Sequence, residues 1–221
     1  MIKGNYLNKP KDYFLHQRKE MMQFIPINAK TVLDIGCSSG NFGKLIKDNY
    51  NCIVWGVEQD SVAAEQASFV LDNVINTQFD ENINLQNKKF DCIVFNDVLE
   101  HFEDPNSKIS FCKNLLNTSG VLVCSIPNIR YFDAFWHIFF KKDFEYTNDG
   151  IFDRTHLRFF TKKSIIRMFE NEGYNIMQIE GINPLSVCNS PLSKRFMILK
   201  RIFPSFFEDM EFLQFAVVAA L

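Results

Sequence analysis

Two acidic residues and a small-residue turn near the start of the chain have the types and spacing of a nucleoside-binding site. The turn contains Gly36, Cys37 and Gly40, and its small residues would let the backbone approach a ligand closely. Asp34 precedes the turn, where its carboxylate can meet a cationic group of the ligand. Glu58 follows Gly36 by 22 positions and is placed to accept hydrogen bonds from the two hydroxyls of a ribose.

A second group of polar residues could move a proton or hold a metal ion. Asp97, Glu100 and His101 have the spacing D-x-x-E-H, and His156 lies further along the chain among charged residues. Either histidine could be the general base that activates a hydroxyl. Together with the two acids they could instead hold a divalent ion, and mixed carboxylate and imidazole ligands favour magnesium or manganese over calcium. A third interpretation is that Glu100 and His101 only cap the following helix.

Alternating apolar patterns predict the elements that position these residues. Runs typical of strands at 31–35, 52–57, 73–77, 90–95 and 121–126 alternate with helical patterns, and two more strands are expected at 174–182 and 211–221. The predicted fold class is α/β: a doubly wound, mostly parallel seven-stranded sheet of Rossmann-like type, with helices on both faces and the last strand antiparallel. Ligands of such sheets bind outside the carboxyl ends of the strands, where Asp34 and Glu58 fall.

Three segments stand outside this alternation within what we expect to be a single domain, 1–221. Residues 10–24 predict an N-terminal helix. The aromatic-rich insertion 129–160, named here the lid segment, follows the fifth strand and is expected to cover the site, because so long a connection is unusual. The alternative is that its aromatic residues extend the core. A second insertion, 185–208, places four cations beside apolar residues.

Composition narrows the class of protein. The chain has 221 residues and a net charge of -2, which argues against a dedicated nucleic-acid binder. No two of the six cysteines are spaced as CxxC, which favours a reduced compartment over a zinc or redox motif. Neither a secretory signal nor an apolar stretch of about 18 residues is present, so no transmembrane segment and a cytoplasmic location are expected.

Four blocks of sequence, in their order and spacing, resemble the class I S-adenosylmethionine-dependent methyltransferases. The blocks are DIGCSSG, GVE, FDCIVFNDVLEHFEDP and LLNTSGVLVCSIPN. Within that class the chain is similar to the subgroup of ubiquinone-pathway O-methyltransferases, and the segment GIFDRTHLRFFT is similar to enzymes encoded with bacterial surface-polysaccharide genes. The chain departs from the family at Ser38, where glycine is usual.

The resemblance implies that the chain is an enzyme that uses S-adenosyl-L-methionine, and it assigns roles by position. Glu58 would hold the ribose, Asp80 would reach the adenine amine, and Asn96 would border the sulfonium. The cofactor-binding residues implied are Asp34, Gly36, Cys37, Gly40, Glu58, Asp80, Asn96 and Asp97. His101 and His156 are the candidate catalytic residues, and the candidate metal ligands are Asp97, Glu100, His101 and His156.

The leading interpretation is O-methylation of a sugar or glycan precursor, which could be lipid-linked. The apolar and basic stretch 193–203 would suit contact with a membrane surface. One alternative is a metal-assisted RNA ribose methyltransferase, since enzymes of that kind share the fold and have a similar E-x-x-E-H with a distant histidine. Another is a non-catalytic cofactor-binding module, for which Ser38 is the best evidence. A nicotinamide oxidoreductase is disfavoured because the glycines fall at 36, 40 and 43 rather than as G-x-G-x-x-G.

Overall fold

The structure is a computed structural model, and it describes residues 17–188 and 190–221. The strands are β1 (Thr31–Ile35), β2 (Ile53–Glu58), β3 (Asn73–Asn76), β4 (Phe90–Asn96), β5 (Leu116–Pro127), β6 (Asn175–Pro184) and β7 (Phe212–Ala220). The α-helices are α1 (Asn41–Asn49), α2 (Ser61–Ser68), α3 (Pro105–Cys112), α4 (Phe132–Trp136), α5 (Lys162–Asn171) and α6 (Pro191–Ile202). Shorter turns are the 3-10 helices η3 (Lys19–Phe24), η4 (Leu99–His101) and η6 (Leu185–Val187) and the π-helix η5 (His137–Lys141). No helix in the described part of the chain is long and apolar enough to span a bilayer.

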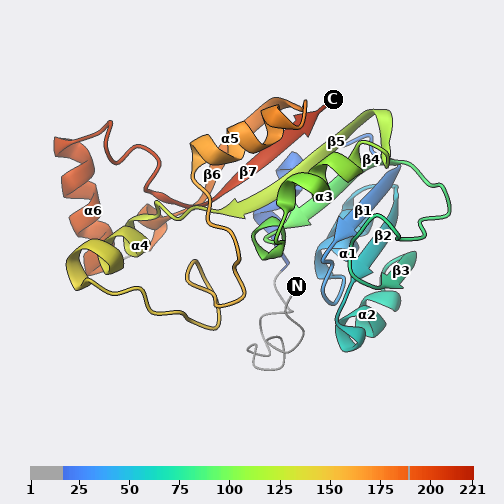
Figure 1. The fold of residues 1–221 in the computed structure, drawn as a ribbon, viewed down its shortest axis with the longest axis horizontal. Helices are drawn as coiled ribbons and strands as arrows, with labels where there is room; N and C mark the ends of the chain where they lie inside the picture. Colours follow the sequence, from blue (N-terminus) through green and yellow to red (C-terminus); the bar gives the residue numbers. More distant parts are fainter. Residues whose placement is uncertain (1–16, 189) are drawn as a thin grey trace.

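The seven described strands form one twisted sheet in the order β3-β2-β1-β4-β5-β7-β6 (Figure 1). The pairs among β1 to β5 are parallel, whereas β7 runs antiparallel to both β5 and β6. This confirms the predicted doubly wound, seven-stranded sheet with an antiparallel last strand. The predicted fifth strand was too short at its start: β5 begins at Leu116 and pairs there with Phe90, across an irregularity in the register.

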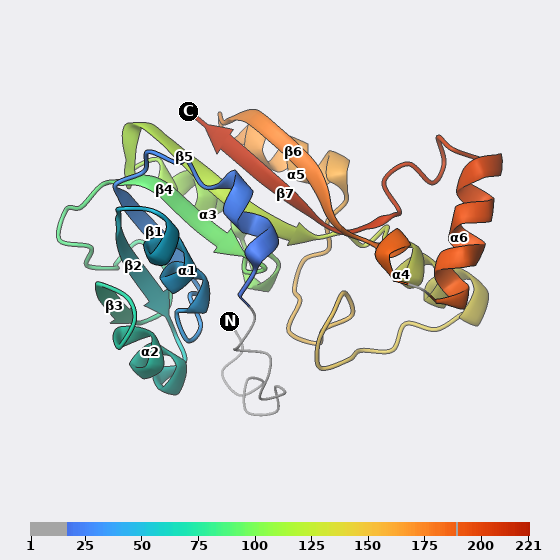
Figure 2. The ribbon, with the colours of Figure 1, turned by 180° about the vertical axis from the view of Figure 1, so that it is seen from behind.

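Helices cover both faces of the sheet, and each face has its own apolar core. On one face α3 and α5 bury Ile109, Ile165 and Phe169 against β4 and β5. On the other face, seen in Figure 2, η3 and α1 bury Phe24 and Ile46. Strands buried on both faces need apolar residues at successive positions, which explains the uninterrupted apolar run of β4.

Caps fix where the helices of the first face begin. Asp104 accepts a hydrogen bond from the N–H of Ser107 and is followed by Pro105 at the start of α3. Thr161 and Ser164 form a capping box at the start of α5. Capping of this kind depends on neighbouring residues only, so it is visible in the sequence around each helix start.

The lid segment divides into two parts with different contacts. Its first part, α4 and η5, packs against α6 at one end of the molecule, beyond the ends of β5, β6 and β7 (Figure 1). We call α4, η5, η6 and α6 the helical lobe. The lobe has a core separate from the two cores of the sheet, made of Phe132, Leu185, Phe196, Phe207 and Met210. The second part of the lid segment returns to the sheet, where Ile151 and His156 line a cavity.

The prediction of one helix over 10–24 differs from the structure. Residues 10–16 lie outside the described residues. Arg18 has a φ of 49°, in the left-handed region, so a right-handed helix cannot run through it. The helical part is therefore the short η3, which buries Met21 and Phe24 against the sheet.

Candidate active site

A cavity of about 790 Å³ lies at the carboxyl ends of β1, β2 and β4, the edge that the topology predicts for a ligand. Residues from the turn after β1, the end of β2 and the end of β4 line one side of it. Residues of η4, of the second part of the lid segment and of β7 complete the lining. The two groups of polar residues found in the sequence therefore share one cavity.

Where β1 and β4 end, two side chains of the cavity have buried polar atoms without hydrogen-bond partners among the described residues. They are the Oδ2 atom of Asp34 and both amide atoms of Asn96. Burial, together with the nearby Glu58 carboxylate, raises the pKa of Asp34 to about 8. Because a native protein seldom leaves buried polar atoms unpaired, this side of the cavity fits a ligand with donors and a positive charge.

Glu58 ends β2 and is held in place by backbone groups. Its Oε2 atom accepts a hydrogen bond from the N–H of Ser38 at 2.9 Å, and its Oε1 atom accepts one from Asp60 at 2.8 Å. The backbone N–H of Gln59 also donates to this carboxylate. A carboxylate has about four lone-pair sites, so about one remains for a ribose hydroxyl. Ser38 adopts a φ of 51°, a left-handed conformation that glycine adopts without strain. The turn thus keeps its shape with serine at this position.

Only some of the other predicted cofactor residues line the cavity. Gly36 and Cys37 line the cavity, whereas Gly40 lies behind it as the N-cap of α1, with a φ of 81°. Beyond β3 the cavity is lined by Phe79 and the two residues before it. Asp80 is not among the lining residues, because its Oδ1 atom accepts a hydrogen bond from the N–H of Asn82 in a local turn.

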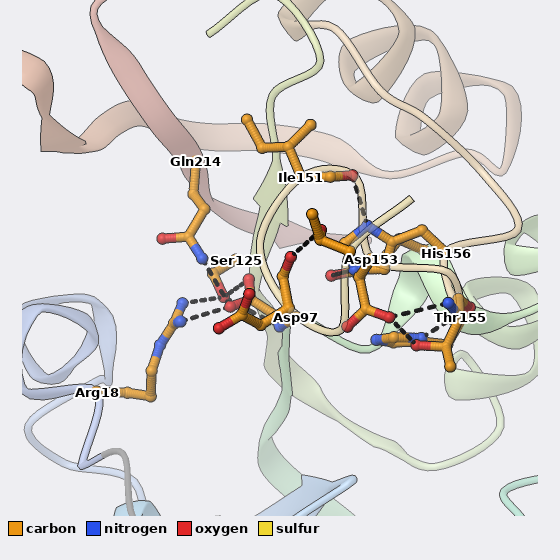
Figure 3. Close-up of polar contacts among 12 residues, drawn as sticks. Arg18, Asp97, Ser125, Ile151, Asp153, Thr155, His156 and Gln214 are labelled. Atoms are coloured by element: carbon orange, nitrogen blue, oxygen red, sulfur yellow. Dashed lines mark hydrogen bonds and ion pairs between the residues drawn. The ribbon is translucent and has the colours of Figure 1, made fainter. Parts of the chain in front are cut away.

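Asp97 is the centre of a polar network that the sequence did not predict. Figure 3 shows Arg18, Ser125 and Gln214 converging on its carboxylate. Arg18 forms an ion pair with Oδ2, Gln214 donates to the same atom at 2.6 Å, and Ser125 donates to Oδ1 at 2.9 Å. Among the described lining residues Arg18 has the only guanidinium or ammonium group. The sequence around Arg18, HQRKEM, contains no pattern that would predict its contact with Asp97.

Glu100, His101 and His156 come together as predicted from sequence. One ligand atom from each lies within 4.8 Å of the others, and all three residues are buried. The Nε2 atom of His156 is 3.8 Å from Oε1 of Glu100. Both carboxylate oxygens of Glu100, which is 1% exposed, have no hydrogen-bond partner among the described residues. Burial, with Asp97 nearby, holds the pKa of Glu100 well above its usual range. Asp97 itself is not brought into this cluster, because Arg18, Ser125 and Gln214 occupy its carboxylate.

Backbone contacts fix the orientation of the two imidazole rings. The Nδ1 atom of His101 lies 3.0 Å from the carbonyl of Thr155, and that of His156 lies 3.0 Å from the carbonyl of Ile151 (Figure 3). A carbonyl oxygen only accepts, so Nδ1 is the donor in each ring and Nε2 is the basic nitrogen. In turn, the carbonyl of Glu100 accepts the N–H groups of Leu157 and Arg158, which ties the lid segment to η4. This arrangement is typical of metal-binding or proton-accepting histidines.

The chain resembles known proteins in sequence and in fold. A family model described as a methyltransferase domain matches residues 10–179. A ubiquinone biosynthesis O-methyltransferase of Glaesserella parasuis serovar 5 (strain SH0165) is 30% identical over 186 residues, which cover 79% of this chain and 75% of that protein. One from Coxiella burnetii (strain RSA 331 / Henzerling II) is 26% identical over 170 residues, covering 75% and 72%. A SAM dependent methyltransferase from Archaeoglobus fulgidus has a similar fold, with a TM-score of 0.69 at 18% identity over 94% of this chain and 96% of that one. The chain therefore belongs to the methyltransferase domain family and is an S-adenosylmethionine-dependent enzyme.

Proposed function

We propose that this methyltransferase methylates a hydroxyl group of a sugar or glycan precursor, with a divalent ion held by Glu100, His101 and His156. The convergence of these three side chains within 4.8 Å carries the proposal. A sugar hydroxyl has a pKa far above neutral, so it must lose its proton to a base or a metal centre as it becomes a nucleophile. An O-methyltransferase needs such a centre, whereas a binding module does not.

The residues across the cavity fit S-adenosyl-L-methionine, which supplies the methyl group when bound. Asp34 and Asn96 would meet the methionine end with their unpaired buried atoms, and Glu58 would hold the ribose. Arg18 would take the carboxylate of the methionine end, since it is the one guanidinium among the described residues that line the cavity. The remaining task of the protein is to align the acceptor hydroxyl with the methyl group and accept its proton.

A metal centre is favoured over a lone histidine base by the buried carboxylate. Ligand atoms around one manganese or magnesium ion lie roughly 3–4 Å apart, close to the separations in this cluster. Bound metal would keep Glu100 ionised despite its burial, which otherwise raises the pKa of that carboxyl. Both rings present Nε2 while Nδ1 donates to a carbonyl, as ligating histidines usually do.

The polar lining of the cavity supports a polyhydroxylated acceptor. Glu20, Asp149, Asn183 and Gln214 line it with carboxylate and amide groups, which pair well with hydroxyls. An RNA acceptor is less well supported, because phosphates require cations and the described lining contains more carboxylates than the single guanidinium of Arg18. The lid segment would close over the acceptor, since its second part is already attached to η4.

Replacing Glu58 by alanine should weaken S-adenosylmethionine binding by at least about tenfold, because hydrogen bonds to a charged group contribute roughly 1.5–3 kcal/mol each. The fold should persist, since Glu58 ends β2 at the cavity and its partners are backbone groups at the surface of the turn. Calorimetry with the purified protein measures the affinity. Glu65→Ala, on the exposed side of α2, is the matched control and should bind as the wild type does. If Glu58→Ala bound S-adenosylmethionine as tightly as the wild type does, Glu58 would not be the residue that binds the ribose.

The proposed reaction is tested with isotopically labelled S-adenosylmethionine, a pool of glycan precursors, and mass analysis of the products. The expected product is a saccharide carrying one labelled methyl ether. Treatment with a chelator should abolish transfer, and added manganese or magnesium should restore it, while the affinity for the cofactor stays the same. Full turnover in a metal-free preparation would exclude the ion and leave a histidine base. Labelled methyl groups found only on nitrogen or carbon would exclude O-methylation.

A further inference from the structure

The helical lobe presents an apolar surface that its own core does not use. Helix α6 turns Phe196 inward against Phe132, with the ring centroids 5.0 Å apart. The opposite side of the same helix carries Met197, Ile198 and Ile202, and Ile198 is 62% exposed. A helix that packs on one side usually has polar residues on the other, so a second apolar side indicates a second contact.

The end of η5 continues this surface. Phe139 and Phe140 are 64% and 56% exposed, although each stacks on a ring of α4. Trp136, the partner of Phe140, also lies under the guanidinium of Arg195 on α6, 5.2 Å from the ring centroid. The exposed aromatic residues of η5 and the outer side of α6 therefore adjoin. Phe203 and Phe206, which follow α6, are exposed as well.

Cations surround these apolar side chains. Residues 185–207 contain four Lys and Arg residues and no Asp or Glu, in a chain whose net charge is -2. Lys200 is paired with Glu211, and Glu208 follows the segment, so Lys194, Arg195 and Arg201 supply the charge of α6. Lys194 and Arg201 lie on the exposed side of α6, and Lys141 and Lys142 follow Phe140. A second copy of the lobe would oppose this face with the same charges, which disfavours self-association through it. An anionic surface that also accepts apolar groups is the complementary partner.

We propose that the helical lobe binds the anionic surface of a lipid bilayer. The exposed apolar side chains of α6 and η5 enter the headgroup region, and the surrounding cations meet lipid phosphates. The lid segment runs directly from the lobe to Ile151 and His156 in the cavity, so a lipid-linked acceptor would be delivered beside the site. The delivery of the acceptor rests on the proposed function, but binding of the lobe to lipid does not.

The test is flotation of the full chain with vesicles of phosphatidylcholine alone or mixed with phosphatidylglycerol. The protein should partition onto the anionic vesicles, less so as salt is raised, and hardly at all onto the neutral ones. The double variant Ile198→Ser with Phe203→Ser should lose at least about tenfold in partitioning. Lys194→Gln with Arg201→Gln should lose about tenfold or more at low salt.

Matched controls lie away from the helical lobe: Phe69 directly follows α2, at the opposite end of the molecule (Figure 1), and Lys88 lies in the loop before β4. Phe69→Ser replaces a residue that is 81% exposed, and Lys88→Gln replaces an exposed cation; both variants should bind vesicles as the wild type does. Absence of binding to anionic vesicles, or wild-type binding by both lobe variants, would overturn the proposal. It is also overturned if the wild type is a dimer that Ile198→Ser with Phe203→Ser dissociates, because a second copy then covers this face.

The experiments distinguish a failure of the helical lobe to bind lipid from a failure of the proposed methyl transfer. A Glu100→Gln protein changes only the cavity and should float with anionic vesicles as the wild type does. Normal vesicle binding without methyl transfer to any glycan would contradict the proposed function alone. If the protein methylates a water-soluble glycan but does not bind vesicles, only the proposal that the helical lobe binds lipid is contradicted.

Discussion

Replacing Glu100 by glutamine should lower the turnover of methyl transfer by about 10²–10⁴, which makes it the most damaging conservative change in the cavity. Glutamine keeps the shape of the side chain but removes the negative charge that a divalent ion or a protonated imidazole would need. The carboxylate is buried and has no hydrogen-bond partner among the described residues, so no neighbouring donor takes over its role. Turnover is measured at saturating cofactor and acceptor.

Three further measurements identify the cause of that loss. The affinity for S-adenosylmethionine should be unchanged, because Glu100 belongs to the cluster with His101 and His156 and not to the residues assigned to the cofactor. The melting temperature should not fall, since burial raises the pKa of Glu100 and a neutral side chain fits the same place. Calorimetric titration of chelated protein with manganese should show weaker binding in the variant. Glu103→Gln, on the exposed loop after η4, is the matched control. Wild-type turnover in Glu100→Gln would refute the proposed centre.

Local sequence patterns were sufficient for the strands and for most of the helices that flank the sheet, and for half of the site. The period of apolar residues predicts the strands, and caps such as Asp104 and Thr161 depend only on neighbours in the chain. Asp34 and Glu58 could be placed because the order of strands in a parallel sheet brings their carboxyl ends to one edge. Glu100 and His101 were grouped because a single turn, η4, carries both.

The rest depends on contacts between distant parts of the chain. Arg18 reaches Asp97 only because a left-handed residue redirects the chain before η3, and their 79-residue separation leaves no pattern to detect. That ion pair is also why Asp97 stands apart from the expected metal ligands. The helical lobe arises because Phe132 packs on Phe196, which comes from the other insertion. The aromatic residues of the lid segment were expected to cover the site, with burial in a core as the alternative, and composition alone could not show that Phe132 packs in the core of the helical lobe.

The affinity for S-adenosylmethionine should rise with pH by roughly 50-fold between pH 6 and pH 8. Burial raises the pKa of Asp34 to about 8, so in the ligand-free protein this carboxyl holds its proton at neutral pH. A cationic methionine end beside it favours the ionised form, and binding must then expel the proton. The ionised fraction of a group with a pKa of 8 is about 1% at pH 6 and about half at pH 8, which gives the expected ratio and its sign.

Calorimetry in buffers of different ionisation enthalpy measures the expelled proton directly. At pH 7 about 0.9 proton should be released for each cofactor bound. Asp34→Asn, which keeps the size of the side chain, should bind more weakly at pH 8, release no proton and show a nearly flat pH dependence. Glu58→Gln serves as the control for the second acid of the site. It should lose affinity yet still release part of the proton, because burial is the larger cause of the raised pKa of Asp34 and the Glu58 charge the smaller one. An affinity for the wild type that falls as the pH rises from 6 to 8 would mean that Asp34 meets the ligand as a neutral donor, and the methionine end would then have to lie elsewhere in the cavity.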